Sequence, residues 1–479
     1  MRKTKIVCTI GPASDSKEVL REMMLAGMNV ARINFSHGSY EEQIARINNV
    51  KEVRQELNLP IALLMDTKGP EIRIGKLIDN EYILKEGQEF TLLNEEVIGD
   101  NTRVSITYKN LYNEVCEGSK ILINDGIIEL KVKQIVGKDI LCDVVHGGKI
   151  SNRKSINVPD LKLNLPSMTE NDISDLKYCI KADFDFVAAS FIRKPQDVLE
   201  IRKVLNENGG ENIKIISKIE NREGINNFDE ILAVSDGIMV ARGDLGVEIP
   251  VYEVPILQKK FIQKCNMVGK PVITATQMLE SMVKNARPTR AEVSDIANAI
   301  FDMTSAIMLS AESASGMYPI ECVRTMSKIA GETENSIDYW AMFSNRKVPV
   351  SRNDYEANSA RAICLTAMSS DAKAIFAYTN TGDSAKRLAG FLPSCPIYAI
   401  LDNPKTFRQL GLSWNIYPRL YNKQGSIEAL VSHSIKDLKN KEKLETGDVI
   451  VISGGGKILK EDQNNEFQFN KTLGGILKV

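Results

Sequence analysis

The segment KIISKIENREGINNFDEILAVSDGIMVARG, residues 214–243, contains two short apolar runs separated by a stretch with helical spacing. The runs Lys214–Glu220 and Gly237–Gly243 have the length and composition of buried strands. Arg222–Ala233, between them, is a candidate for a short helix. A strand, a helix and a second strand in this order form the unit from which parallel α/β sheets are built.

The same alternation extends over most of the chain. Apolar runs rich in β-branched residues occur at Thr4–Gly11, Asn29–Ser36, Ile61–Lys68, Phe184–Phe191, Lys214–Glu220, Gly237–Gly243, Pro271–Gln277 and Ala306–Glu312. Helical stretches lie between them at Ser16–Leu25, Glu41–Leu57, Asn171–Lys181, Pro195–Asn206, Val254–Val268 and Arg290–Met303. This pattern predicts a (β/α)₈ TIM barrel. A doubly wound open sheet is the alternative, and eight parallel strands favour closure.

The alternation is interrupted between residues 69 and 166, where helical spacing disappears. Short strands and turns replace it, as in EGQEFTLL (86–93), TRVSITY (102–108) and KILINDGIIELKV (120–132). Asn124-Asp125-Gly126 has the composition of a hairpin turn. We expect a small β-barrel domain inserted after the third barrel strand. An insertion there lies on the face that carries barrel active sites, so we interpret it as a lid.

A third unit follows the barrel. It comprises a predicted helix at Tyr355–Ser369, a strand at Ala374–Tyr378, a helix at Ala385–Leu392, and strands at Asp448–Ser453 and Gly474–Val479. This is the pattern of an open α/β domain. The predicted organisation is barrel (1–68), β lid (69–166), barrel (167–340) and C-terminal α/β regulatory domain (341–479).

Composition excludes several classes of protein. The 479 residues carry 61 Lys and Arg against 62 Asp and Glu, so no global field would hold nucleic acid or an anionic membrane. No apolar run reaches the ~20 residues of a membrane span. The 8 cysteines form no C-x-x-C pair, which favours reduced thiols in the cytoplasm. The opening residues MRKTKIVCTIGPAS are interpreted as a first strand and not as a signal peptide.

Polar residues gather at the predicted carboxyl ends of six barrel strands, where they face the catalytic mouth. They include Arg32, Asn34, Ser36, Asp66, Thr67, Lys218, Glu220, Asp244, Thr276 and Glu312. Any one of them could be a solvated strand end. All of them together are harder to explain in that way, because unpaired buried charge is costly.

The residue types indicate a reaction class. Glu220 and Asp244, on neighbouring strands, could offer oxygens to one Mg²⁺. Lys218 lies two residues before Glu220 and therefore on the same face of the strand. Arg32 and Arg73 add positive charge suited to phosphate or carboxylate. The glycines of RGDLG (242–246) expose backbone N–H groups that could hold an anion. We expect a Mg²⁺ site for a small, highly anionic substrate, such as a phosphorylated acid.

Six segments resemble the signature segments of the pyruvate kinase family, in that family's order. They are NFSHG (34–38), DTKGPEIR (66–73), SKIEN (217–221), MVARGDLGVEIP (239–250), ATQMLESM (275–282) and RPTRAEVSDIANAI (287–300). The resemblance covers essentially the whole chain. It implies a barrel with a β lid and a regulatory domain, usually a homotetramer. The implied reaction, the last step of glycolysis, converts phosphoenolpyruvate, ADP and a proton into pyruvate and ATP.

The resemblance also implies roles for individual residues. The ligands of Mg²⁺ or Mn²⁺ would be Glu220 and Asp244, and those of K⁺ would be Asn34, Ser36, Asp66 and Thr67. The substrate carboxylate would lie against Gly243, Asp244 and Thr276, with Lys218 at the transferring phosphoryl group and the enolate oxygen. Phosphate and nucleotide contacts would come from Arg32, Arg73 and His37. Thr276 either relays a proton to the enolate or only holds the carboxylate.

Two positions bear on cofactor and nucleotide use. Glu71 stands where K⁺-dependent members have Glu and independent ones have Lys, so we expect a requirement for K⁺. The alternative is that Glu71 pairs with Arg73 or Lys68 at the lid hinge. Asn171 stands where many members have a lysine that helps to hold the nucleotide phosphates.

The turn TNTGDS, residues 379–384, joins a predicted strand to a helix in the C-terminal domain. Its N–H groups and the hydroxyls of Thr379, Thr381 and Ser384, around Gly382, could hold the phosphate of an allosteric effector. An ordinary capped helix start is the alternative.

Two other functions remain open from the residues alone. One is another Mg²⁺-dependent barrel enzyme that acts on a pyruvate-like enolate, such as an aldolase or a carboxylate lyase. Such an enzyme needs neither the lid nor a nucleotide site. The other is a catalytically silent binding protein, which would have no reason to keep the charges of Lys218, Glu220 and Asp244.

Overall fold

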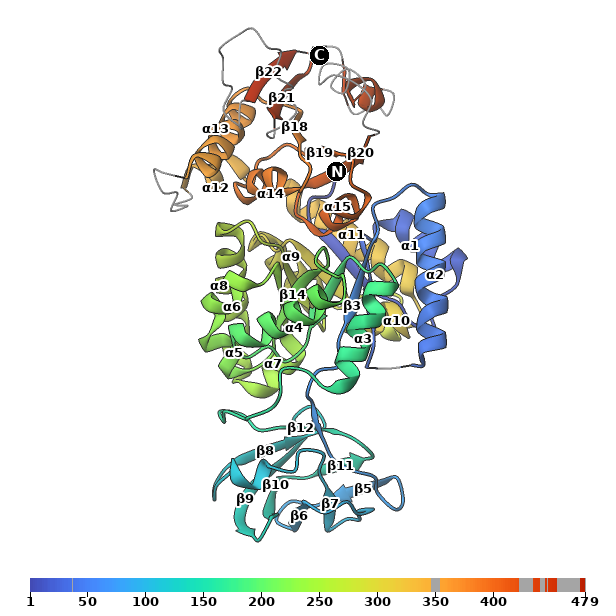
Figure 1. The fold of residues 1–479 in the computed structure, drawn as a ribbon, viewed down its shortest axis with the longest axis vertical. Coiled ribbons are helices and arrows are strands. Elements are labelled where there is room, and N and C mark those ends of the chain that lie inside the picture. Colours follow the sequence, from blue (N-terminus) through green and yellow to red (C-terminus); the bar gives the residue numbers. More distant parts are fainter. Residues whose placement is uncertain are drawn as a thin grey trace.

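The computed structural model describes residues 1–36, 38–345, 354–421, 434–439, 444–445, 447–454 and 474–478. Figure 1 shows three units arranged along the long axis, with the β lid at one end, the barrel in the middle and the C-terminal domain at the other end. Among the described residues, no helix combines the length and the hydropathy that crossing a membrane requires.

Eight parallel strands close the central barrel in the order β1-β17-β16-β15-β14-β13-β3-β2. Their bounds are β1 Lys5–Thr9, β2 Val30–Asn34, β3 Ala62–Asp66, β13 Phe186–Ala189, β14 Lys214–Ile219, β15 Gly237–Ala241, β16 Val272–Ala275 and β17 Ala306–Leu309. Each lies within one of the eight apolar runs, and the predicted TIM barrel is therefore confirmed.

Helices surround the barrel. They are α1 Lys17–Ala26, α2 Tyr40–Glu56, α3 Glu170–Lys181, α4 Pro195–Glu207, α5 Arg222–Asn226, α6 Phe228–Val234, α7 Arg242–Glu248, α8 Val254–Met267, α9 Arg290–Phe301, α10 Ala311–Ala314 and α11 Pro319–Asn335, with short 3₁₀ turns η2 Val251–Glu253 and η3 Glu280–Val283. Ser39, Thr169 and Thr289 begin α2, α3 and α9 with capping boxes.

The stretch expected as one helix at 222–233 forms two. Asn227 interrupts it with φ −96° and ψ 15°, and its side-chain amide donates to Arg193 O at 2.8 Å. A side chain that bonds the backbone of a neighbouring segment in this way competes with helix continuation.

Apolar side chains fill the barrel interior. They come from the inward faces of its strands and include Val7, Val30, Leu64, Phe186, Ile216, Met239, Ile273 and Met308. Leu412 of the C-terminal domain belongs to the same buried cluster, so that domain contributes to the packing of the barrel itself.

The lid is a separate β unit with its own buried core. Its strands are β4 Ile72–Arg73, β5 Glu81–Leu84, β6 Glu89–Leu93, β7 Arg103–Ser105, β8 Lys120–Ile123, β9 Ile128–Val136, β10 Asp139–His146, β11 Gly148–Ser151 and β12 Ser155–Asn157, with a 3₁₀ turn η1 at Leu111–Asn113. Seven strands form a sheet in the order β4-β12-β8-β9-β10-β6-β7, and β5 pairs with β11. A bridge between Ile74 and Ile106 joins the two edges of the sheet, as a small barrel requires.

The predicted hairpin turn joins β8 to β9. Asn124 and Asp125 have φ of 58° and 55°, and Gly126 has φ of 82°. Such left-handed residues are those that tight hairpins favour. The turn lies against α7 of the barrel, since a Cβ at Gly126 would contact Val247 at 3.6 Å.

The C-terminal domain is an open α/β sheet. Its elements are α12 Tyr339–Asn345, α13 Tyr355–Ser369, β18 Ala374–Tyr378, α14 Asp383–Gly390, β19 Ile397–Leu401, α15 Pro404–Gln409, η4 Leu410–Leu412, β20 Ile416–Leu420, β21 Val449–Gly454 and β22 Gly474–Lys478. The sheet order is β20-β19-β18-β21-β22, and only the β21–β22 pair is antiparallel.

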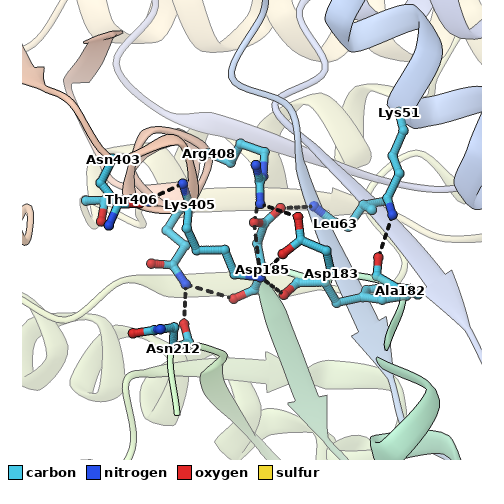
Figure 2. Close-up of polar contacts among 12 residues, drawn as sticks. Lys51, Leu63, Ala182, Asp183, Asp185, Asn212, Asn403, Lys405, Thr406 and Arg408 are labelled. Atoms are coloured by element: carbon cyan, nitrogen blue, oxygen red, sulfur yellow. Dashed lines mark hydrogen bonds and ion pairs between the residues drawn. The ribbon is translucent and has the colours of Figure 1, made fainter. Parts of the chain in front are cut away.

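A buried ion cluster joins this domain to the N-terminal ends of two barrel strands (Figure 2). Asp185, fully buried just before β13, accepts from Arg408 Nε of α15 at 2.8 Å and from Leu63 N of β3 at 2.8 Å. Lys405 and Arg408 also bind Asp183, at 2.7 and 2.8 Å. Burial raises the pKa of Asp185, and the surrounding cations oppose that rise. The C-terminal domain is therefore held at the face opposite the lid.

Replacing Arg408 tests how much this cluster contributes. Arg408→Met leaves Asp185 buried, with longer contacts of 3.6 Å to Arg54 and 3.9 Å to Lys405. Removing one partner of a buried pair costs roughly 3–5 kcal/mol, so we expect the free energy of unfolding to fall by about that amount. Urea unfolding followed by tryptophan fluorescence measures it, because Trp414 is only 4% exposed.

Arg324→Met is the control. Arg324 pairs with Glu22 at 2.9 Å, but both side chains are about half exposed, so this pair should contribute little. Equal shifts of the unfolding midpoint in the two variants would contradict a special role for the buried cluster.

Candidate active site

The carboxyl ends of β2 and β3 bring a buried arginine and a buried aspartate together. The two strands pair with Asn34 opposite Asp66. Arg32 Nε donates to Asp66 Oδ2 at 2.6 Å, and Arg32 Nη1 donates to Thr9 Oγ1 on β1 at 2.7 Å. Asp66 is 1% exposed. Three neighbouring strands are thus linked at the mouth of the barrel.

Lys218 extends from β14 into the same cluster. Its Nζ lies 2.9 Å from Glu220 Oε1 and 3.2 Å from Asp66 Oδ1, and it donates to Ser190 Oγ at 2.9 Å. Burial alone would lower the pKa of Lys218, but the neighbouring carboxylates outweigh burial and raise it. The ammonium is therefore held charged and fixed in position.

The charge of Asp66 is maintained in the same way. Burial disfavours its ionised form, yet Arg32 and Lys218 together hold the pKa of this carboxyl below its usual value. At neutral pH, Asp66 is therefore a carboxylate in direct contact with the positively charged Arg32 and Lys218.

Ser190 is a member of the cluster that the sequence reasoning missed. It follows β13, donates to Thr67 O at 2.6 Å and accepts from Lys218. Its backbone N–H donates to Thr67 Oγ1 at 3.1 Å. The available signal was the rule already applied to six other strands, because the fourth apolar run also carries a hydroxyl residue, Ser190, next to its last residue.

Glu220 and Asp244 form a carboxylate pair beside Lys218. Glu220 is 1% exposed, and its Oε2 accepts from Phe191 N at 2.6 Å. Burial raises the pKa of Glu220, and Asp244 adds to that rise while Lys218 opposes it. Burial likewise raises the pKa of Asp244. Two carboxylates that repel each other, Glu220 buried and Asp244 half-buried, could hold a divalent cation, whose charge would stabilise both.

The donor set fits Mg²⁺ in number as well. Across the described part of the chain, no group of three or more His, Cys, Asp or Glu side chains is placed to hold a metal ion. Mg²⁺ typically takes one or two protein carboxylates and completes its shell with water and substrate oxygens. Glu220 and Asp244 would therefore hold Mg²⁺ or Mn²⁺ together with a substrate.

Thr276 follows β16 and faces the start of α7. Its hydroxyl accepts from Gly243 N at 2.7 Å and donates to Ala275 O at 2.6 Å. Thr276, Gly243 and Asp244 thus lie together, as the resemblance implies for the seat of a carboxylate.

The predicted K⁺ ligands occupy the ends of β2 and β3. Asn34 Oδ1 accepts from Ser36 N at 3.0 Å, while Asp66 and Thr67 are bonded to the Lys218 cluster through Ser190. The pairing of Asn34 with Asp66 places the ends of these two strands side by side, and K⁺ binding itself stays a prediction.

Two other predicted groups lie apart from the cluster. Arg73 bonds Glu71 at 2.6 Å and Arg153 O at 2.7 Å near the lid hinge, which is the alternative interpretation given above for Glu71. The 379–384 turn belongs to the domain on the opposite face of the barrel (Figure 1). His37 lies outside the described residues.

A cleft separates the lid from the barrel mouth. Its lining includes Glu71, Asp125, Asn157, Asp244 and Glu248. Asn157 Nδ2 of the lid donates to Glu248 Oε1 of α7 at 2.8 Å, which ties the lid to the barrel across this cleft. Asp244 of the carboxylate pair is therefore reached from a partly covered cavity.

Comparison with known proteins identifies the family. The family described as pyruvate kinase, barrel domain, matches residues 1–323, and the pyruvate kinase alpha/beta domain matches residues 358–466. The chain belongs to the pyruvate kinase family. Pyruvate kinases are phosphotransferases, so the enzyme class expected from the sequence is confirmed.

Individual pyruvate kinases are similar over nearly the whole chain. That of Clostridium acetobutylicum is 50% identical over 456 residues, which cover 95% of this chain and 96% of the relative. That of Clostridium perfringens is 49% identical over 457 residues, with the same coverage. That of Sporosarcina psychrophila is 48% identical over 460 residues, which cover 95% of this chain and 78% of the relative.

Proposed function

We propose that the protein transfers the phosphoryl group of phosphoenolpyruvate to ADP, with Mg²⁺ or Mn²⁺ and K⁺, and so produces pyruvate and ATP. The observation that carries this proposal is Lys218, whose buried ammonium is fixed by Asp66, Glu220 and Ser190 beside the Glu220–Asp244 pair. A fixed cation next to a donor set for a divalent metal suits the neutralisation of a moving phosphate.

Phosphoryl transfer depends on positioning and on charge stabilisation more than on covalent catalysis. The bond from phosphorus to the enol oxygen breaks as an oxygen of the ADP β-phosphate attacks. Lys218 stabilises the negative charge that develops on the phosphoryl oxygens and the enolate oxygen. A bound divalent cation would supply further neutralisation of these oxygens. Arg32, already fixed by Asp66, offers its guanidinium to phosphate.

The enolate must then take up a proton. A contact of Thr276 with the substrate carboxylate is supported by its hydroxyl, which accepts from Gly243 N beside Asp244. Two roles fit this placement: the hydroxyl passes a proton toward the enolate carbon through water, or it only orients the carboxylate. A hydroxyl is a weak acid by itself, so a relay needs a proton source beyond Thr276.

Pyruvate release from phosphoenolpyruvate tests the function and the role of Lys218 together. Release should require ADP and a divalent cation in the wild type. Lys218→Met should lower kcat by at least ~10²–10³, since the ammonium acts mainly in the transition state, while substrate binding suffers less. Pyruvate and ATP are measured by coupled assays.

Lys214→Met is the matched control. Lys214 lies at the amino end of the same strand, at the end of the barrel away from the site, and pairs with Asp236 at 3.3 Å. It should leave kcat nearly unchanged. A fall of less than tenfold in Lys218→Met would refute the assigned role. Pyruvate formation without ATP would favour a lyase, and no turnover at all would favour a binding protein.

We further propose that the activity requires K⁺. Asn34, Ser36, Asp66 and Thr67 supply oxygens beside the phosphate region but no fixed cation of their own. When tetramethylammonium replaces K⁺ at constant ionic strength, the wild-type rate should collapse, because that ion is too large for the site. Glu71→Lys should recover part of the rate by supplying a permanent ammonium.

The control for this test follows from the Glu71–Arg73 pair. Glu71→Lys also breaks that pair, and Glu71→Gln weakens it without adding a positive charge. Recovery in Glu71→Lys alone therefore assigns the effect to the ammonium. Full wild-type activity without K⁺ or a comparable small cation would refute the requirement.

A phosphorylated effector at the 379–384 turn is part of the same proposal. Helix α14 starts at Asp383, its N-cap residue Gly382 has no side chain to cap it, and Thr381 Oγ1 accepts from Asp383 N at 3.4 Å. The Ser384 hydroxyl is buried without a hydrogen-bond partner, and Thr379 Oγ1 accepts from Gly382 N at 2.9 Å. An unused hydroxyl donor at a helix start supports binding of a phosphate.

Sugar phosphates and nucleotides, added one at a time, test this site. We expect at least one to lower the phosphoenolpyruvate concentration that gives half-maximal rate, and Ser384→Ala to weaken that shift without changing the rate in its absence. If none of these compounds changes the dependence of the rate on phosphoenolpyruvate, the proposal of an effector site is refuted. Assembly as a homotetramer and a cytoplasmic location stay predictions.

A further inference from the structure

The backbone after β16 is strained at a residue of the site. Thr276 has φ of 69° and Gln277 has φ of 55°, both in the left-handed region. A β-branched residue is a rare occupant of this region, because its side chain crowds the backbone. Such a conformation persists only where surrounding contacts compensate for its cost. Those contacts should reveal what positions Thr276.

Arg242 supplies contacts to both peptide carbonyls at this point. Its Nη2 donates to Thr276 O at 2.7 Å, and its Nε donates to Ala275 O at 3.2 Å. Asp295 of α9 fixes the same guanidinium through Nη1 at 2.7 Å. The Arg242 side chain is 11% exposed, so these bonds are largely shielded from water.

Glu312 holds the other end of the same turn. It is fully buried, and its two oxygens accept from Leu279 N at 3.0 Å and from Ser310 N at 2.7 Å. The residues after β16 are therefore bonded on one side to α7 and α9 through Arg242, and on the other side to the end of β17.

The Arg242 contact to Ala275 O has a specific consequence for the hydroxyl of Thr276. That hydroxyl donates its hydrogen to Ala275 O at 2.6 Å. To donate to a substrate carboxylate, the hydrogen must leave this carbonyl, and a buried carbonyl without a partner is costly. Arg242 Nε keeps Ala275 O bonded when the hydroxyl turns away, so the turn costs less.

We propose that Arg242 is a positioning residue for Thr276, with Asp295 fixing its guanidinium. It stabilises the left-handed conformation of Thr276 and keeps Ala275 O satisfied while the hydroxyl bonds the carboxylate of the substrate. The inference rests on the proposed function, because it requires that Thr276 contacts phosphoenolpyruvate.

Arg242→Lys and Thr276→Val, alone and combined, test the coupling. A lysine cannot bond two carbonyls and a carboxylate in the planar geometry of arginine. Arg242→Lys should lower kcat/KM for phosphoenolpyruvate by about 10²-fold, the scale of loss expected when a contact is misplaced by about 1 Å. KM for ADP should stay within about twofold, since no nucleotide contact is assigned to this turn.

The double variant separates positioning from structural support. If Arg242 acts through the Thr276 hydroxyl, Arg242→Lys should cause little further loss once Thr276 is valine. Losses that multiply in the double variant would overturn the inference, as would an equal rise of KM for ADP. Wild-type kinetics in Thr276→Val would instead refute the contact with substrate on which the proposal rests.

Asp295→Asn keeps the test informative if Arg242→Lys fails to fold. Asp295 is 38% exposed, and asparagine retains an oxygen acceptor for the guanidinium but not the charge. We expect a smaller loss in the same parameter, again suppressed by Thr276→Val. A loss that Thr276→Val leaves unsuppressed, or no loss at all, would overturn the inference.

Arg202→Met is the matched control on the opposite face. Arg202 also donates to two carbonyls, Ile213 O at 2.9 Å and Glu211 O at 3.4 Å, and to Asp236 at 2.8 Å. It has the same kind of contacts without proximity to the site. Its substitution should leave both KM values unchanged, and an effect like that of Arg242→Lys would assign the loss to general weakening of the barrel.

Discussion

The carboxylate of Asp66 is the interaction on which the rest of the site depends. It accepts from Arg32 on β2 and from Lys218 on β14, and Ser190 after β13 lies within 3.2 Å of it. Without this carboxylate, Arg32 would lose its ion-pair partner, and Lys218 would have only Glu220 in direct contact, with Asp244 nearby. Because burying charge is tolerated only when it is paired, the position of Asp66 determines where Arg32 and Lys218 can lie.

The register of the parallel barrel makes that arrangement possible. Ala188 pairs with Asp66 across β13 and β3, and Ala189 pairs with Ser217 across β13 and β14. Ala188 belongs to the interior cluster of the barrel, and its small side chain leaves room for Lys218 to reach past β13 toward β3. Asp185, which directly precedes the same strand, is bound by the C-terminal domain at the opposite face (Figure 2). One short strand therefore carries both the attachment of that domain and part of the site.

Sequence periodicity was sufficient for the architecture, because strand burial and helix amphipathicity are local patterns with known repeats. The strand-end rule located Arg32, Asp66, Lys218 and Glu220 for the same reason. Side-chain pairing was harder to predict. From the sequence, Arg73 could pair with Glu71 or contact a phosphate, and the contact with Glu71 is seen only once the lid hinge is folded. Ser190 could have been found by the same rule, whereas the break at Asn227 depends on a carbonyl from another segment.

At Thr276 the backbone preference of the residue conflicts with the need for its hydroxyl. Several barrel helices begin with the side-chain caps that their sequences predict, although Phe191 and Met303 also have positive φ, of 56° and 69°. At residue 276 a threonine occupies a conformation that asparagine or glycine would adopt more readily. Glycine would relieve the strain but would remove the hydroxyl that bonds Gly243 N. The threonine is therefore explained by its side-chain chemistry, and the buried contacts of Arg242 and Glu312 compensate for its backbone.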